Sequence, residues 1–232
     1  MENYFNAPVF ILGLPRSGTS MVAGAASLCG AWSGTTVPGD EASNPRGFFE
    51  HVAIREHVVK RLLLSMGCDP LGVRKLPVEK PQGEIPGLAA LLKNIVEHDG
   101  YSHDRPWMYK DAKLTLLWPY FQKAFPDAKW LIVNRDLPGF IRSCQRTHFM
   151  KQHSTEPAFW EQFAAQYHRR LAALKNSDAS VFELSSPEII GGDFSRLKQT
   201  FLQLGLDYRE DELRTFISPT FWHGDDSRVS DG

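Results

Sequence analysis

The feature that most constrains this chain is an apolar run near the N-terminus that ends in a loop flanked by glycines. Residues 8–14 (PVFILGL) are continuously apolar, which is typical of a strand covered on both faces within a parallel sheet. The loop 15–20 follows, and the small side chains of residues 19–29 predict a helix that packs close to its neighbours. A strand, a glycine loop and a helix in this order favour an α/β fold.

Strand and helix signals alternate along the rest of the chain. Short apolar runs predict three more strands, at 107–110, 129–134 and 180–184. Helical spacing predicts helices at 50–64, 115–125 (with Pro119 in its first turn), 138–146, 156–175 and 194–204 (with Asp193 as its cap). This alternation predicts a three-layer α/β fold of the P-loop type, in which a parallel sheet is flanked by helices.

Length and composition bound the domain organisation. A chain of 232 residues with 42% hydrophobic residues is long enough for one domain with a sizeable core. We expect a single domain over 1–222 and a flexible tail over 223–232. Stretches rich in Gly and Pro predict irregular insertions near 32–47 and 67–87, which are usual for lids or binding loops.

The charge balance excludes some classes of partner. With 26 basic and 27 acidic residues, the chain has a formal net charge of −1, which argues against nucleic-acid binding and a polybasic membrane surface. Three scattered cysteines, Cys29, Cys68 and Cys144, suit a reducing compartment and predict no metal cluster. No basic leader and no run near the roughly 18 apolar residues of a membrane span are present. We therefore expect a cytoplasmic protein without a membrane span.

The loop after the first strand has the spacing of a phosphate-binding site. Residues 13–20 (GLPRSGTS) follow the pattern G-x-x-x-x-G-T-S, with Thr19 where nucleotide hydrolases have lysine. Glycines let backbone N–H groups face an anion, and the N-terminus of the next helix adds the positive end of its dipole. The residues expected to contact the anion are Pro15, Arg16, Ser17, Gly18, Thr19 and Ser20.

The missing lysine argues against a nucleoside-triphosphate site. In such sites the lysine contacts the β- and γ-phosphates, and a strand-end acid helps to hold magnesium. Here the cation of the loop is Arg16, and LIVNRD places Asn134 and Arg135 ahead of Asp136. A P-loop nucleotide or small-molecule kinase is nevertheless the nearest alternative.

A second cation follows another predicted strand. Arg135 lies where the 129–134 strand ends, and Ser143 falls on the helix that comes next. Neighbouring parallel strands are about 4.8 Å apart, so the two strand ends are roughly 5–10 Å apart if adjacent or separated by one strand. That spacing suits one nucleoside with phosphates on both its 5′ and 3′ positions. Taken singly, Arg135 could also form a salt bridge with Asp136, and Ser143 could be a surface residue.

These segments together resemble the sulfotransferase superfamily, whose members transfer a sulfuryl group from 3′-phosphoadenosine 5′-phosphosulfate (PAPS). ILGLPRSGTS resembles the 5′-phosphosulfate loop of that family, and VNRDLPGFIRS resembles its 3′-phosphate segment. YKDAKLTLLWPYFQKAFPDAKWLIVNRD and FELSSPEIIGGDFSRLKQTFLQLGL resemble later segments of bacterial and tyrosylprotein members. The resemblance covers most of the chain. It implies PAPS as co-substrate, adenosine 3′,5′-bisphosphate as product, and no metal.

Three departures from the family pattern stand out. Asp111 is followed by Ala112 where the family has proline, and no G-x-x-G-x-x-K segment occurs near the C-terminus. No match is found for the histidine base of the cytosolic enzymes. Closure over the nucleotide is therefore expected to differ from the cytosolic type.

The resemblance also suggests catalytic residues. Arg16 is the first choice for the 5′-phosphate and leaving oxygens, and Lys110 is a candidate second cation, with an ordinary surface lysine as the alternative. NPRGFFE resembles N-P-x-G-x-F-E of bacterial members, which makes Glu50 the preferred base and Glu41 the second choice. A base that works at neutral pH would need partial burial to raise its pKa. Further candidates for the base are Asp40, His51 and His57.

The acceptor is left open by the sequence. We expect a small-molecule or carbohydrate hydroxyl, positioned by the two irregular insertions, and the oligomeric state is not indicated. A non-catalytic module that binds a nucleoside bisphosphate is the alternative to an enzyme.

Overall fold

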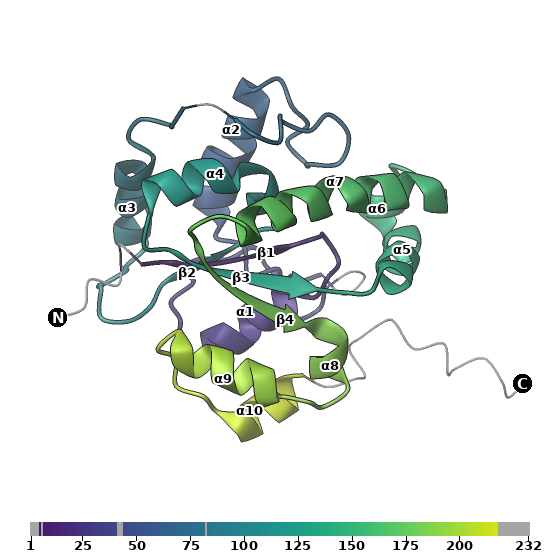
Figure 1. Ribbon diagram of the computed structural model, residues 1–232. Helices are drawn as coiled ribbons and strands as arrows, with labels where there is room; N and C mark the ends of the chain where they lie inside the picture. The colour runs from purple at the N-terminus through teal and green to yellow at the C-terminus, as the bar shows by residue number, and fades with distance from the viewer. Residues whose placement is uncertain (1–4, 6, 41–43, 82, 218–232) are drawn as a thin grey trace, which may run out of the picture.

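The computed structural model describes residues 5, 7–40, 44–81 and 83–217 (Figure 1). Four parallel strands form one sheet in the order β2-β1-β3-β4. The strands are β1 (Val9–Gly13), β2 (Met108–Lys110), β3 (Lys129–Asn134) and β4 (Ser180–Ser185). Because β2 pairs with one side of β1 and β3 with the other, the winding reverses at β1. Ligands of open α/β sheets bind at the carboxyl ends of the strands beside such a reversal.

Helices cover both faces of the sheet. The helices are α1 (Thr19–Leu28), α2 (Lys60–Ser65), α3 (Leu88–His98), α4 (Leu114–Ala124), α5 (Leu137–Arg146), α6 (His148–Lys151), α7 (Pro157–Lys175), α8 (Ser186–Ile190), α9 (Ser195–Gln203) and α10 (Glu210–Phe216). A π-helical segment, η1 (Ile54–Val59), runs directly into α2. Figure 1 shows α3, α4 and α7 above the sheet, and α1, α9 and α10 below it. None of the described helices is long and apolar enough to cross a membrane.

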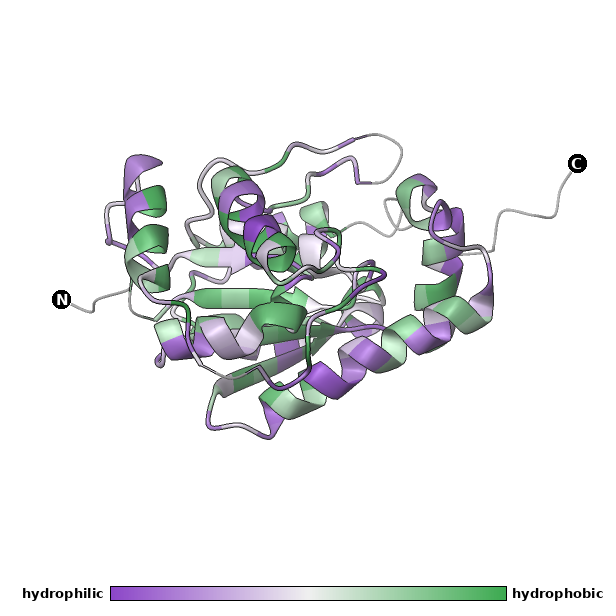
Figure 2. Ribbon diagram, turned by 90° about the horizontal axis from the view of Figure 1, so that it is seen from above, coloured by the Kyte–Doolittle hydropathy of each residue, from purple (hydrophilic) through white to green (hydrophobic). Residues whose placement is uncertain are grey.

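The core consists of one apolar layer on each face of the sheet. Along β1, Phe10 and Leu12 pack into one buried cluster, whereas Val9 and Ile11 pack into the other. The strands are largely green in Figure 2, as expected when both faces are covered. The three-layer α/β fold expected from the sequence is confirmed.

The strands begin and end within one residue of their expected positions, and so do all the expected helices except 50–64, where η1 and α2 cover 54–65. Because α4 begins at Leu114, Pro119 lies in its second turn rather than its first. Phe194, not Asp193, is the N-cap of α9, and the Asp193 carboxylate accepts a hydrogen bond from the Ser195 N–H. The sequence patterns did not indicate α3, α6, α8 or α10. The whole expected tail (223–232) and the boundary at 222 lie outside the described residues.

Candidate active site

A cavity of about 500 Å³ lies at the carboxyl ends of β1, β2 and β3. The loop after β1, residues 44–50, the end of β2, Arg135 after β3, Ser143 of α5 and the α6 region all contribute to its lining. It therefore lies at the reversal of the sheet, where a ligand is expected.

The loop after β1 has the backbone of an anion-binding turn. Arg16 and Gly18 adopt left-handed conformations (φ 66° and 93°), which suits a loop whose N–H groups converge on an anion. At Gly13 a Cβ would lie 2.5 Å from the Val133 carbonyl oxygen of β3, so only glycine fits there. The Ser17 hydroxyl donates to the Leu14 carbonyl oxygen at 2.7 Å, so this hydrogen bond stabilises the loop and the hydroxyl proton is not directed at an anion.

The two expected anion-binding strand ends meet at one edge of the sheet. β1 and β3 are adjacent, with Gly13 opposite Val133. The Arg16 Nε donates to the Ser143 hydroxyl at 3.2 Å, and the Arg135 Nη1 donates to the Arg16 carbonyl oxygen at 3.0 Å. The juxtaposition expected from the sequence is thus confirmed, and the binding role of each residue stays a prediction.

Two features of α5 explain this arrangement. The Asp136 carboxylate caps the helix by accepting a hydrogen bond from the Gly139 N–H at 2.6 Å. Ser143 then lies two turns along the helix and is buried. Burial lowers the pKa of the Arg16 and Arg135 guanidinium groups from their ordinary values. Two partly desolvated cations side by side make this edge favourable for an anion.

Lys110, at the end of β2, is buried and joins two parts of the site. The residue is only 3% exposed, which excludes the surface-lysine alternative. The Nζ donates to the Ser20 hydroxyl at 3.1 Å, to the Phe48 carbonyl oxygen at 3.0 Å and to the Glu50 Oε1 at 2.9 Å. Phe49, between these partners, has a left-handed backbone (φ 55°), a conformation that costs roughly 1–2 kcal/mol for a side-chain-bearing residue.

Glu50 lies between cations. Its Oε1 faces Lys110, and its Oε2 is 3.0 Å from the Nε of Arg55, which belongs to the π-helical segment η1. Burial alone would raise the pKa of Glu50, but the positive charges of Lys110 and Lys113, the hydrogen bond from Lys110 and the charge of Arg55 lower it to about 2. Glu50 therefore does not have the raised pKa that a base working at neutral pH would need.

Comparison with known proteins decides the family. A family profile described as the sulfotransferase family matches residues 8–203. This protein belongs to the sulfotransferase family. No curated protein sequence matches the chain significantly.

Solved structures agree with this assignment at the level of the fold. The sulfotransferase domain of the Synechococcus PCC 7002 olefin synthase is 16% identical, with a TM-score of 0.57, and the match covers 97% of this sulfotransferase and 88% of that chain. The sulfotransferase domain from the curacin biosynthetic pathway is 13% identical, with a TM-score of 0.54, covering 94% and 78% of the two chains.

Three of the other candidate bases of this sulfotransferase are not among the residues that line the cavity, although the charge of Asp40 acts on the pKa of Arg16, which does line it. His51 is buried, with its Nε2 3.2 Å from the Asp99 Oδ2, and His57 is exposed. Asp40 is exposed as well, and neither it nor the two histidines line the cavity. Glu41 lies outside the described residues.

An ion pair that the sequence patterns did not indicate lies beside Glu50. The Lys113 Nζ is 2.8 Å from the Asp111 Oδ1, and Asp111 also accepts a hydrogen bond from the Tyr109 hydroxyl at 2.9 Å. Burial opposes the charge of Lys113, but Asp111 and Glu50 outweigh it and raise the lysine's pKa. The charged run K-D-A-K directly after a strand is the signal that could have indicated this pair. Within the described ranges, no group of three or more His, Cys, Asp or Glu is arranged to hold a metal ion.

Proposed function

We propose that this sulfotransferase transfers a sulfuryl group from PAPS to a hydroxyl acceptor and releases adenosine 3′,5′-bisphosphate. The observation that carries the proposal is the contact of Lys110 with both Ser20 of the phosphate loop and Glu50. This contact brings an anion site, a cation and a carboxylate together at one strand end. Those are the parts that acid–base chemistry beside a phosphate leaving group requires.

The residues present fit the two charged ends of PAPS. The backbone of the loop over 15–20, with Arg16, would bind the 5′-phosphosulfate. Arg135 and Ser143 would bind the 3′-phosphate on the adjacent strand end. The burial that lowers the pKa of both arginines supports this assignment, because an anion between them offsets the desolvation of the guanidinium groups.

Glu50 would act as the base. It takes the proton of the acceptor hydroxyl, and the acceptor oxygen forms a bond to sulfur as the bond from sulfur to the bridging oxygen breaks. The electron pair of the broken bond goes to the phosphate, where Arg16 and Lys110 supply positive charge. Since these side chains provide the cations, we propose that the reaction uses no metal.

The low pKa of Glu50 is compatible with this role only if Lys110 leaves it. Lys110 already contacts Ser20 of the phosphate loop, so an anion bound there gives the ammonium group a second negative partner. Once Lys110 turns toward that anion, Glu50 loses its nearest cation while it stays buried. Its pKa then rises, and the carboxylate becomes a stronger base.

The acceptor in this proposal is a small-molecule or carbohydrate hydroxyl. A cytoplasmic location is supported by the three cysteines, which are buried free thiols. Membership of the sulfotransferase family favours this activity over that of a kinase.

The proposal is tested by incubating the protein with PAPS and a panel of alcohols, phenols and sugars. Release of adenosine 3′,5′-bisphosphate is measured with and without acceptor and with a metal chelator. We expect release that depends on an acceptor and is insensitive to the chelator. Transfer from ATP that requires magnesium would establish the kinase instead, and the absence of any turnover would leave a binding module.

A further inference from the structure

The cavity has two unlike halves. One half is formed by the phosphate loop, Arg135 and Ser143, and is polar. The other includes Leu71, Val73, Phe149 and Met150, which we call the apolar wall, together with Gln152 and His153 beside it. Leu71 is 51% exposed and Phe149 is 41% exposed, although both are large apolar side chains. Exposed apolar side chains gathered at a cavity mark a ligand surface.

The turn that carries Leu71 and Val73 is fixed in place by hydrogen bonds. The Asp69 carboxylate accepts from the N–H groups of Leu71, Val73 and Arg74 at 2.9–3.0 Å. The Arg74 Nη2 donates to the His153 carbonyl oxygen at 2.7 Å, which ties the turn to the segment that follows α6. These hydrogen bonds therefore hold Leu71 in its exposed position.

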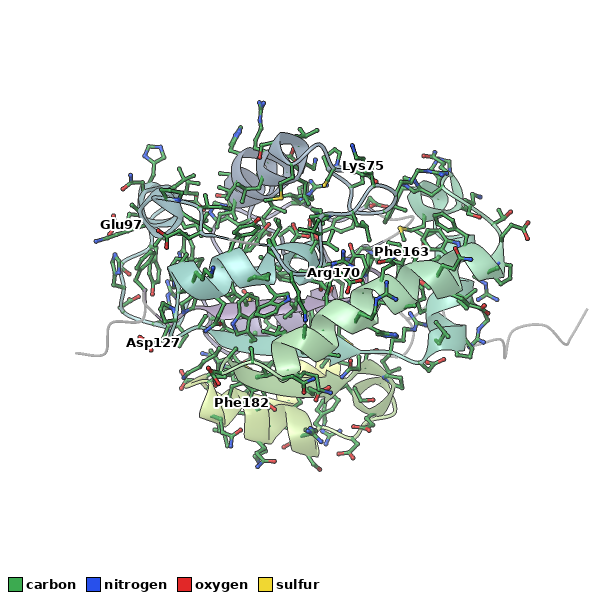
Figure 3. The ribbon with its side chains drawn as sticks, turned by 45° about the horizontal axis from the view of Figure 1, so that its top comes forward. Lys75, Glu97, Asp127, Phe163, Arg170 and Phe182 are labelled. Atoms are coloured by element: carbon green, nitrogen blue, oxygen red, sulfur yellow. The ribbon has the colours of Figure 1, made fainter. Side chains whose placement is uncertain are left out.

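Helix α7 supports the same turn from below. The Tyr167 hydroxyl donates to the Gly72 carbonyl oxygen at 2.9 Å, and the Arg170 Nη2 donates to the Pro77 carbonyl oxygen at 2.6 Å. Figure 3 shows Arg170 and Phe163 on α7, beneath the connection that carries Lys75. A Cβ on Gly72 would stand 2.9 Å from the Tyr167 hydroxyl, so the turn packs directly on the helix.

Two cations of the cavity lining, Arg55 and Lys113, already form ion pairs with carboxylates. Arg55 forms ion pairs with Glu50 and Glu56, each at 3.0 Å, and Lys113 forms one with Asp111 at 2.8 Å. An acceptor with carboxylates, such as an acidic peptide, would have to displace these pairs. A sugar would place most of its hydroxyls against the apolar wall, where Gln152 and His153 are the neighbouring lining residues with polar side chains.

We infer that the acceptor is an alcohol with an apolar body, whose hydrocarbon or aryl part lies against the apolar wall while its hydroxyl faces Glu50. This inference rests on the proposed function. It assigns Leu71 and Phe149 the role of residues that determine specificity for the acceptor.

The test measures kcat/KM with PAPS for butanol, hexanol and octanol, and for glucose and an acidic tyrosine peptide. Each added CH2 is expected to raise kcat/KM about threefold until the wall is covered. Leu71→Asn is expected to lower the value for octanol about tenfold and to leave butanol nearly unchanged. Leu64→Asn is the matched control, because Leu64 on α2 is also 51% exposed but does not line the cavity.

Several outcomes would overturn the inference. These are a kcat/KM that does not depend on chain length, a preference for glucose or the peptide over octanol, and equal losses from Leu71→Asn and Leu64→Asn. Binding of adenosine 3′,5′-bisphosphate, measured by calorimetry on the same preparation, separates the two proposals. If it binds and glucose is the better acceptor, the inference fails alone, and if it does not bind, the proposed function fails first.

Discussion

The two halves of the cavity are built in different ways. The donor half is made by strand ends, and its critical residues follow β1 and β3, which are paired in register. The acceptor half is made by irregular connections. These are held by hydrogen bonds between residues far apart in sequence, such as Tyr167 with Gly72 and Arg170 with Pro77. The sheet thus fixes the position of the proposed anion site. The acceptor wall depends on side-chain contacts that can change without disturbing the sheet.

Replacing the base is expected to have the largest effect. Glu50→Gln should lower kcat by about 10²–10⁴-fold, because it removes proton transfer from the acceptor. Its affinity for adenosine 3′,5′-bisphosphate, measured by calorimetry, should stay within about threefold of the wild-type value, since the donor half is intact. Glu56→Gln is the matched control, because Glu56 also contacts Arg55 but lies outside the cavity lining.

Glu41→Gln, made separately, tests the second choice for the base. We expect a smaller loss of kcat than for Glu50→Gln. A larger loss at Glu41, with Glu50→Gln close to wild type, would reassign the base.

Removing the cation at the 3′-phosphate end of the donor half should distinguish nucleotides that carry a 3′-phosphate from those that do not. Arg135→Ala is expected to lower the affinity for adenosine 3′,5′-bisphosphate by about 10–100-fold, because charge-assisted hydrogen bonds to the 3′-phosphate are lost. The affinity for adenosine 5′-monophosphate, measured in the same calorimeter, should change much less. Arg142→Ala, at an exposed position of α5, is the control. Equal losses for both nucleotides would contradict the role assigned to Arg135.

Removing a hydrogen bond that holds the acceptor half in place should leave nucleotide binding by the donor half unchanged. Tyr167→Phe removes the hydrogen bond to the buried Gly72 carbonyl oxygen and should lower the free energy of unfolding by about 1–3 kcal/mol. The KM for the acceptor should rise severalfold while the Kd for the bisphosphate stays constant. Tyr208→Phe is the control, since the Tyr208 hydroxyl is buried without a hydrogen-bond partner among the described residues. A bisphosphate Kd that rises with the acceptor KM would show that the halves are not independent.

The smallest effect concerns pH. Because the folded pKa of Glu50 is lowered from 4.5 to about 2, its contribution to stability is complete above pH 4.5 and is lost as the pH falls toward 2. Urea unfolding at about pH 5 and about pH 3 should therefore show a loss in the wild type that exceeds the loss in Glu50→Gln by about 1–2 kcal/mol. Identical pH dependences would mean that the ion pair with Lys110 contributes no stability.

The same contrast explains what the sequence could and could not predict. The donor half was predictable because the apolar run of β1, the G-x-x-x-x-G-T-S loop and Arg135 are local patterns, and parallel strands end at one edge. Lys110 was suggested only by resemblance, because its burial depends on Ser20 and Glu50, which lie 90 and 60 residues away.

The acceptor half was not predictable for the same physical reason. Nothing local to Gly72 or Leu71 indicates that Tyr167 and Arg74 fix the turn against α7 and the α6 region. The lowered pKa of Glu50 was also missed. It results mainly from the charges of Lys110 and Lys113, which lie about 60 residues further along the chain, and to a smaller extent from Arg55 in the π-helical segment η1.

The central claim is that the ends of two adjacent strands bind opposite ends of one nucleoside bisphosphate. Calorimetry on the wild-type protein tests it most directly, by comparing adenosine 3′,5′-bisphosphate with adenosine 5′-monophosphate, adenosine 3′-monophosphate and ATP plus magnesium. We expect the bisphosphate to bind at least about tenfold more tightly than any of the other three, because only it contacts both strand ends. Binding of either monophosphate, or of ATP with magnesium, as tight as that of the bisphosphate would contradict the claim.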